Sequence, residues 1–306
     1  MGETGRNRLG RGQCPISEED IEKYLPYSPF TPYFHWYPGR VEQCWVVTDC
    51  LYEASGESLK QQFAATALVM GLVPPTLKDI AWPERRIVPV TQKLKPLAEI
   101  LVLALGLVPR ETGNIHVTKK ESISKTRIAK FAWRLSTSRR VFWLTVCIFL
   151  VSMSYTGTVF MEIYSKRSAL GCSFPVFIAM WHVFALLPAS IHTIFARFRR
   201  KREAHNVSGQ IQSRNDDGMI ASAVQGANED WPVQLAWGIY YITGILVFAS
   251  IMAVTVVELA CWIGLVIAIA GSSKALGFFI CLVCEEIENG VDNSGQSQNL
   301  GGVGRN

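Results

Sequence analysis

Three carboxylates recur at four-residue intervals in the first quarter of the chain: Asp49, Glu53 and Glu57. On a continuous helix, this spacing places all three on one face. Carboxylate oxygens are the ligands that Mg²⁺ prefers, and a magnesium ion held there could bind a substrate diphosphate, as in intramembrane prenyl-transfer enzymes. Those enzymes also need a second acidic motif, which is not visible here. The alternative that we favour is a solvated helix face, with Lys60 near enough to soften its charge.

Two histidines, His182 and His192, lie inside an apolar stretch, where an ionisable residue is a functional candidate. Proton transfer by His182 is one hypothesis. Ten residues rotate a helix by roughly 1000°, which leaves the two side chains about 80° apart. A shared metal site is therefore not expected. A neutral histidine hydrogen-bonded to a neighbouring helix is the alternative that we favour.

The C-terminal apolar stretch contains two charges, Glu258 and Lys274, and two cysteines, Cys281 and Cys284. On a continuous helix the two charges would lie about 24 Å apart. We therefore expect each to snorkel to an interface. The cysteine spacing occurs in metal and redox sites, but no second pair completes a zinc site. We predict no metal ion and no cofactor, since phosphate loops, nucleophile elbows and dinucleotide fingerprints are also missing from the sequence.

Small residues recur every four positions at Ala260, Gly264 and Ala268. Such a row lets two helices approach each other closely inside a membrane. It predicts a packing seam. The expected partner is either another copy of the chain, in a homo-oligomer, or another membrane protein.

Long apolar runs must position these residues. A helix needs about 20 residues to cross the hydrocarbon core of a bilayer. Four runs approach that length: 141–161, 174–196, 235–257 and 259–284. Pro188 should kink the second run. The last run has two interpretations. It is either a fourth span that contains a buried lysine, or a continuation of the third helix followed by a separate short helix. We expect four spans, with three as the alternative.

Residues 41–118 precede these runs and hold shorter apolar segments. Val41–Val73 predicts one long helix that Pro74-Pro75 should end. Its apolar half, Phe63–Val73, and a second run, Leu97–Val108, are too short to cross a bilayer. We expect interfacial or re-entrant helices there, or a packed core.

The remaining segments are polar. Residues 1–40 are dense in proline and aromatic residues, 197–233 form a polar loop, and the tail 285–306 is rich in Gly, Asn and Ser. The tail is predicted to be disordered. Four cysteines outside the apolar runs could pair only in an oxidising compartment, and no spacing demands it. They are Cys14, Cys44, Cys50 and Cys172.

Basic residues gather beside the apolar runs, which fits anionic lipid headgroups better than a nucleic-acid groove. The bilayer is therefore the expected partner, and nucleic acid is not. Eight Lys or Arg lie in Lys119–Arg140, directly before the first span. Two lie in the linker Glu162–Ser173, and six lie between the second and third spans. By the positive-inside rule the linker lies outside and the large basic loops lie in the cytosol. The sequon at Asn206 would then stay unglycosylated.

One block of residues resembles a known family. It comprises Trp36–Gly39, Cys44-Trp45, Cys50, Lys60–Gln62 and Met70–Pro74. The block is similar to one found in uncharacterised multi-pass membrane proteins of filamentous fungi, and it covers residues 36–110. The resemblance implies membrane residence and a fungal source, and it carries no assigned activity.

Together these patterns predict an all-α, multi-pass integral membrane protein with three to four transmembrane helices and short interfacial or re-entrant helices. The role that we expect is non-catalytic, as an accessory or interaction protein. One alternative is a lipid-modifying or cyclising enzyme that uses the acidic helix face. Another is a small oligomeric transporter, although no inverted repeat is visible in the sequence.

Overall fold

The computed structural model describes Cys14 and residues 41–79, 87–92, 94–125, 127–166, 176–207, 230–251 and 253–300. The rest of the N-terminal segment 1–40 and residues 208–229 of the predicted polar loop lie outside the described residues. Within them the chain is mostly helical with one small sheet. The all-α prediction is therefore confirmed.

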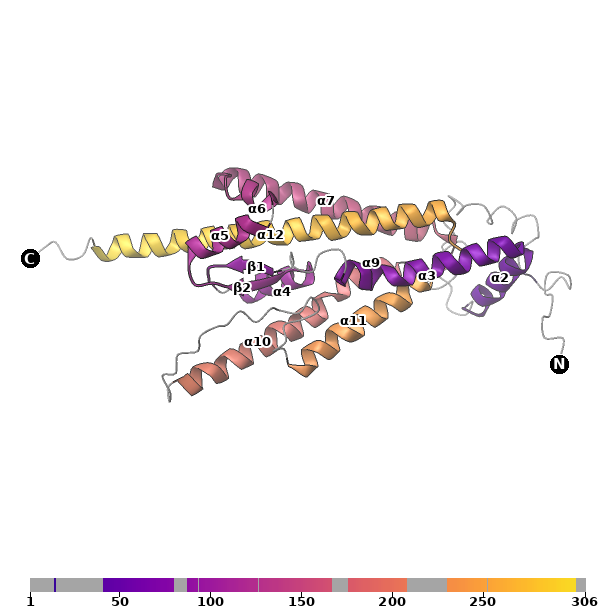
Figure 1. Cartoon of the computed structure of the whole chain (residues 1–306), viewed down its shortest axis with the longest axis horizontal. Helices are drawn as coiled ribbons and strands as arrows, with labels where there is room; N and C mark the ends of the chain where they lie inside the picture. The colour runs from indigo at the N-terminus through magenta and orange to yellow at the C-terminus, as the bar shows by residue number, and fades with distance from the viewer. Residues whose placement is uncertain are drawn as a thin grey trace, which may run out of the picture. The chain divides into compact units, whose positions relative to one another are not determined.

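The helices and strands follow one another along the chain as labelled in Figure 1. They are α2 (Val41–Ala54), α3 (Glu57–Asp79), β1 (Ile87–Val90), α4 (Pro96–Ala104), β2 (Val108–Glu111), α5 (Ile115–Lys125), α6 (Arg127–Ala132), α7 (Thr137–Ile163), α9 (Phe177–Phe184), α10 (Leu186–Val207), α11 (Trp231–Ala249) and α12 (Val256–Leu300).

Four helical stretches among the described residues are long and apolar enough to cross a membrane. They are Thr137–Ile163, Phe177–Arg199, Trp231–Ala249 and Val256–Ile287. Each contains most of one predicted apolar run, so the expectation of four membrane-spanning segments agrees with the structure. By length and composition, these helices mark the chain as a membrane protein.

Two of the predicted apolar runs are interrupted, the second as its proline predicts and the third unexpectedly. The run 235–257 is not one helix, because α11 ends at Ala249 and α12 begins at Val256. The second span breaks at Ala185, between α9 and α10. Pro188 explains the second break, since its ring clashes with the carbonyl four residues earlier, at Phe184, where α9 ends.

The predicted single helix over Val41–Val73 is wrong in two respects. The chain breaks at Ser55-Gly56 between α2 and α3, and α3 then continues through Pro74 and Pro75 to Asp79. Glycine at position 56 lowers the cost of the break. The prolines are tolerated because Pro74 is buried, so packing offsets the lost backbone hydrogen bond.

The apolar run Leu97–Val108 contains a short helix, α4, as expected, and this helix belongs to a small β-α-β unit that was not expected. Strands β1 and β2 pair in parallel, with Ile87 opposite Val108, and α4 connects them. Helix α4 ends at a glycine, Gly106, with φ of +87°. The Leu107 amide donates to the Val102 carbonyl at 3.1 Å and closes the turn. This Schellman motif stops the helix in the middle of the apolar run. Neither strand was predicted, because each has only four residues and includes a proline.

Two helices extend further than the polar sequence suggested. Helix α10 carries the basic cluster and runs to Val207, inside the predicted loop. Helix α12 runs to Leu300, so residues 285–300 of the tail that was predicted to be disordered are helical, and residues 301–306 lie outside the described residues. Extending a nucleated helix adds one hydrogen bond for each residue fixed, which explains why polar residues can follow an anchored apolar helix.

The described residues belong to two compact units. Unit 1 comprises Met1–Leu77, Met153–Phe184 and Ile239–Ala268. Unit 2 comprises Lys78–Ser152, Ala185–Gly238 and Ile269–Asn306. Boundaries fall inside α3, α7, α11 and α12, so these four helices contribute residues to both units.

Unit 1 has a core of large side chains from α3, α9, α11 and α12. Its buried members are Met70, Ile178, Trp181, Phe248, Ile251, Val254, Trp262 and Val266. The Trp181 indole stacks on Tyr240 with centroids 4.7 Å apart and donates its N–H to the Tyr240 carbonyl at 2.9 Å. A Cβ at Gly244 would lie only 2.7 Å from the Trp181 ring. Glycine is therefore required where α11 passes this indole.

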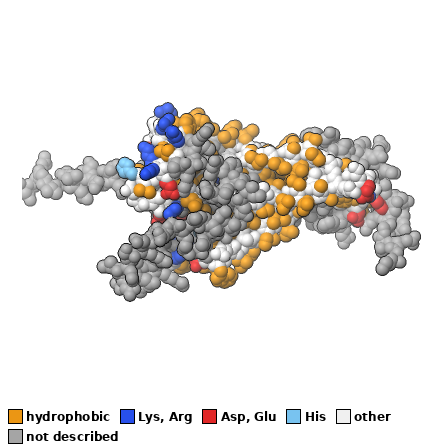
Figure 2. Space-filling view, viewed as in Figure 1, with side chains coloured by type: hydrophobic (Ala, Val, Ile, Leu, Met, Phe, Trp, Pro, Cys, Tyr) orange, Lys and Arg blue, Asp and Glu red, His pale blue; other side chains and the backbone are white. Residues whose placement is uncertain are grey.

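Unit 2 has two cores that share α12. One joins the β-α-β unit to Cys281 and includes Val90, Val102 and Leu107. The other joins the α6–α7 region to Leu276, Phe279 and Leu282 of α12, among others. Figure 2 shows many hydrophobic side chains on the described surface and an area where Lys and Arg gather. An apolar exterior of this kind suits contact with lipid.

Candidate functional site

A buried lysine forms the most constrained polar site in unit 1. Lys166 follows α7, and its side chain is only 1% exposed. Its ammonium donates to the Ala253 carbonyl at 2.7 Å and lies 3.4 Å from a Glu258 carboxylate oxygen. It also lies 5.2 Å from the centroid of the Phe63 ring, within the range of a cation–π contact. Backbone dipole, carboxylate and ring together replace the water that this cation loses.

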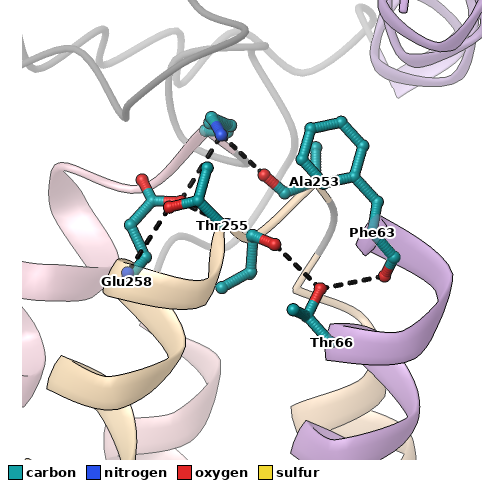
Figure 3. Close-up of polar contacts among 7 residues, drawn as sticks. Phe63, Thr66, Ala253, Thr255 and Glu258 are labelled. Atoms are coloured by element: carbon teal, nitrogen blue, oxygen red, sulfur yellow. Dashed lines mark hydrogen bonds and ion pairs between the residues drawn. The ribbon is translucent and has the colours of Figure 1, made fainter. Parts of the chain in front are cut away.

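Glu258 has two roles at the start of α12. Its carboxylate accepts from the Thr255 amide at 2.8 Å and the Thr255 hydroxyl at 2.9 Å. The Glu258 amide is within 3.4 Å of the same hydroxyl oxygen. This reciprocal pair is a capping box, which satisfies free amides at the helix start. Figure 3 shows both residues at the first turn of the helix.

Helix α3 joins the same site through Thr66. The Thr66 hydroxyl lies 2.8 Å from the Val254 carbonyl and 3.0 Å from the Phe63 carbonyl. Figure 3 draws Thr66 and Phe63 together on α3. Val254 and its neighbour Ala253 belong to the turn between α11 and α12. Ala253 has φ of +54°, a left-handed conformation that costs a non-glycine residue free energy. Its carbonyl is thereby fixed as an acceptor for Lys166.

Burial changes the acid–base properties of two groups around this turn. It lowers the pKa of Lys166, because desolvation disfavours the ammonium, and the nearby Glu258 opposes the shift. It raises the pKa of Tyr52 on α2, because desolvation disfavours the phenolate, and a hydrogen bond to the Ala253 backbone opposes that shift. Tyr52 from α2 and Lys166 from the segment after α7 therefore both contact the Ala253 backbone.

A second buried carboxylate, Glu162, lies at the end of α7. Its two oxygens accept from the Ile178 amide at 2.5 Å and the Ala179 amide at 3.1 Å. These amides belong to the first turn of α9, where free N–H groups and the helix dipole favour an anion. Glu162 therefore joins α7 to α9 in place of an N-terminal cap from α9 itself.

The predicted acidic face does not exist as one surface. Asp49 and Glu53 lie on α2, whereas Glu57 begins α3, after the break at Ser55-Gly56. The four-residue spacing thus crosses a helix boundary, and the alignment that it requires is lost. Among the described residues, no three His, Cys, Asp or Glu side chains form a group that could hold a metal ion.

The predicted histidines lie on different helices and in different units. His182 is half-buried on α9, and its Nδ1 lies 2.8 Å from the Ile178 carbonyl of the same helix. We had expected His182 to bond to a neighbouring helix, but the partner of its Nδ1 is the Ile178 carbonyl, one turn away on α9 itself. His192 is half-buried on α10.

The residues predicted on the last helix have separate surroundings. Glu258 pairs with Lys166, so snorkelling does not describe Glu258. Lys274 is half-buried further along α12. Cys281 and Cys284 lie one turn apart and are not joined in a disulfide, and Cys281 packs in a core of unit 2. Asn206 lies in the last turn of α10 and not in a loop.

The row of small residues faces outward. Ala260, Gly264 and Ala268 are all exposed, and a Cβ at Gly264 would meet nothing within 4 Å. The side of α12 that packs in unit 1 carries Trp262 and Val266 instead. The row is therefore not a seam within the described chain, and contact with another chain stays a prediction.

Sequence reasoning missed Lys166 and Glu162 as site residues. It treated both as parts of a short polar linker, because a side chain's burial by distant segments has no local signal. Thr255-Val256-Val257-Glu258 was readable, because it has the spacing of a capping box and marks the start of a helix. The pairing of Cys14 with Cys50, whose Cα atoms are 6.1 Å apart, had been left open.

Comparison with known proteins adds no relative. No protein-family model matches the chain, and neither the curated proteins nor the solved structures include a match.

Proposed function

We propose that this chain is a multi-pass integral membrane protein with a non-catalytic, accessory or interaction role. The observation that supports the proposal is how unit 1 uses its buried charges. Glu162 accepts from backbone amides, and Lys166 contacts a backbone carbonyl and Glu258. Side chains held in this way fix the ends of helices and are not presented to a substrate.

The interaction partner would be another transmembrane helix, from a second copy or a different protein. The exposed row Ala260, Gly264 and Ala268 on α12 supports this part of the proposal, because small residues let helix backbones approach closely. Membership of a fungal membrane family stays a hypothesis that rests on the sequence block alone.

We also propose a topology in which the linker between α7 and α9 lies outside and the basic segments lie in the cytosol. The distribution of basic residues supports it, because eight Lys or Arg lie in residues 119–140 directly before the first span and six lie between the second and third spans, whereas only two lie in the linker.

The functional proposal is tested by replacing Asp49 with Asn and Glu53 with Gln in one variant. In a strain whose growth depends on this chain, we expect the double variant to support growth as well as the parent does. Western blotting of isolated membranes provides the control for its level. Loss of growth at a normal membrane level would favour the enzyme alternative.

The interaction surface is tested by Gly264→Leu, with Ile267→Leu on an exposed position of the same helix as the control. We expect Gly264→Leu to reduce the oligomer or co-purified partner found by crosslinking in membranes, and Ile267→Leu to leave it unchanged. Equal crosslinking in all three proteins would contradict a contact at this row.

The topology is tested by glycosylation mapping. A sequon inserted into the linker Glu162–Ser173 should be modified in a eukaryotic host, whereas Asn206 should not. Digestion with a glycosidase followed by gel electrophoresis measures both. Modification of Asn206 would contradict the proposed orientation.

A further inference from the structure

Unit 2 contains a cavity of about 340 Å³, a volume suited to a small ligand group. Its walls come from α5, the segment after α6, the start of α7, and α12. The polar and aromatic residues that line it are His116, Lys119, Trp133, Arg140, Glu285 and Glu286.

Two buried donors in this lining have no acceptor. The indole Nε1 of Trp133 and the guanidinium Nε of Arg140 are buried without a hydrogen-bond partner among the described residues. The rest of Arg140 is held firmly, with one Nη 3.1 Å from Glu286 and the guanidinium 5.6 Å from the Trp133 ring centroid. Buried donors are costly unless an acceptor satisfies them, so a ligand oxygen that reached these two groups would be stabilised.

The cavity lining also carries negative charge. Glu285 accepts from the Thr91 backbone amide and, at 2.9 Å, from the Thr91 hydroxyl. Glu286 accepts from Arg140 and from the Thr137 hydroxyl. A simple anion that satisfied the two donors would also face these two carboxylates. A ligand with both a phosphate and an ammonium group would match the donors through its phosphate and the two carboxylates through its ammonium.

The sequence places these walls at the ends of candidate membrane spans. Arg140 directly precedes the uncharged run that begins at Val141, and Glu285 lies in the last turn of the span Val256–Ile287. Two apolar residues, Ile115 and Leu282, complete the cavity lining. Charged and aromatic side chains at span ends lie at the level of lipid headgroups.

We propose that this cavity binds the headgroup of a zwitterionic phospholipid that carries a primary amine. The phosphate accepts hydrogen bonds from Trp133 Nε1 and Arg140 Nε, with Lys119 beside it. The ammonium faces Glu285 and Glu286. A soluble phosphoamine offers the same chemistry without acyl chains. This site is separate from the interaction role proposed above and does not depend on it.

The test uses the full chain in a detergent free of lipid and phosphate. Native mass spectrometry and thermal unfolding are followed during titration with phosphatidylethanolamine, phosphatidylglycerol or glycerophosphoethanolamine. We expect phosphatidylethanolamine to bind and raise the Tm, and phosphatidylglycerol, which lacks the amine, to bind at least about tenfold more weakly. Binding of the lipid alone identifies the bilayer as the source, whereas equal binding of the soluble compound identifies a free metabolite.

Trp133→Phe removes one donor and keeps the ring. We expect this variant to bind phosphatidylethanolamine about tenfold more weakly, because it loses a hydrogen bond to a charged group. Its Tm without lipid should be unchanged or higher, since a buried donor without an acceptor is gone. Lys119→Gln, on an exposed side chain, should weaken binding severalfold without affecting the core.

Trp143→Phe is the matched control, since Trp143 lies on α7 outside the cavity lining. It should bind like the parent. The proposal is overturned if neither amine-bearing compound binds, if phosphatidylglycerol binds as tightly as phosphatidylethanolamine, or if Trp133→Phe and Lys119→Gln both bind like the parent.

Discussion

The buried polar groups of unit 1 and unit 2 are used in opposite ways. In unit 1 the ammonium of Lys166 contacts a carbonyl, a carboxylate and an aromatic ring, and its side chain is 1% exposed. In unit 2 the side chain of Arg140 is 13% exposed, yet its Nε and the Trp133 indole N–H lack acceptors beside a cavity.

This difference separates a structural role from a binding role. A buried charge whose partners all come from the chain stabilises the ends of the helices that it joins. A buried donor without an acceptor among the described residues is satisfied only when something else supplies one. Four predictions test this comparison, from the largest expected effect to the smallest.

Replacing Lys166 with Met should lower the free energy of unfolding by about 3 kcal/mol, because it leaves the Glu258 carboxylate without its cation. Unfolding in mixed micelles with increasing denaturing detergent measures the change. Adding Glu258→Gln to the same chain should recover part of the loss. A change below about 1 kcal/mol would show that the lysine is not structural, and the contrast with Arg140 would disappear.

Glycine replacements compare the packing of the two units. Gly244→Ala in unit 1 should cost about 2 kcal/mol, since its Cβ would lie 2.7 Å from a buried indole ring. Gly277→Ala in unit 2 should cost less, because its Cβ would meet the end of the Leu107 side chain at 2.9 Å, which can rotate away. The same unfolding assay measures both, and equal costs would contradict tighter packing around Trp181.

Glu162→Gln keeps the shape of the side chain and removes its charge. We expect a loss of about 1 kcal/mol, because the α9 amides lose a charged acceptor at a helix N-terminus. Thermal unfolding measures the change, with Glu121→Gln, a less buried carboxylate on α5, as the control. A Tm equal to the parent's would exclude Glu162 as a cap for α9.

The pH dependence of stability should also report on Lys166. Its pKa is lowered in the folded chain, so above that pKa the unfolded chain binds the proton more tightly. The free energy of unfolding contributed by this group should therefore rise with pH, from the folded-state pKa up to the ordinary value of 10.5. Unfolding at several pH values, parent against Lys166→Met, isolates this small effect. If the parent instead lost stability relative to Lys166→Met as the pH rises, burial would not be the dominant cause of the pKa shift of Lys166.

The sequence predicted well what depends on local composition. Runs such as 141–161 identify membrane helices because burial of apolar residues in lipid needs no particular partner. It predicted poorly where helices end. The breaks at Gly56 and between Ala249 and Val256 had local signals, a glycine and a capping box, that hydropathy alone does not weigh.

The candidate sites show the same limit more sharply. Asp49, Glu53 and Glu57 satisfied a helical spacing, but that spacing assumed one continuous helix, and the break after α2 removed the shared face. Lys166 looked like an ordinary linker residue until Phe63, Ala253 and Glu258 surrounded it. These contacts join residues about 90 or more positions apart, and no local pattern encodes them.

The sequence by itself therefore determined the class of the protein, the approximate extent of its apolar helices and the distribution of its basic residues. These properties are sums over neighbouring residues and are insensitive to the arrangement of the helices. The tertiary structure decided which charges are satisfied within the chain and which residues line a cavity. Burial and hydrogen bonding depend on distant segments meeting in space, and only the folded chain brings Lys166 to Glu258 and Trp133 to Arg140.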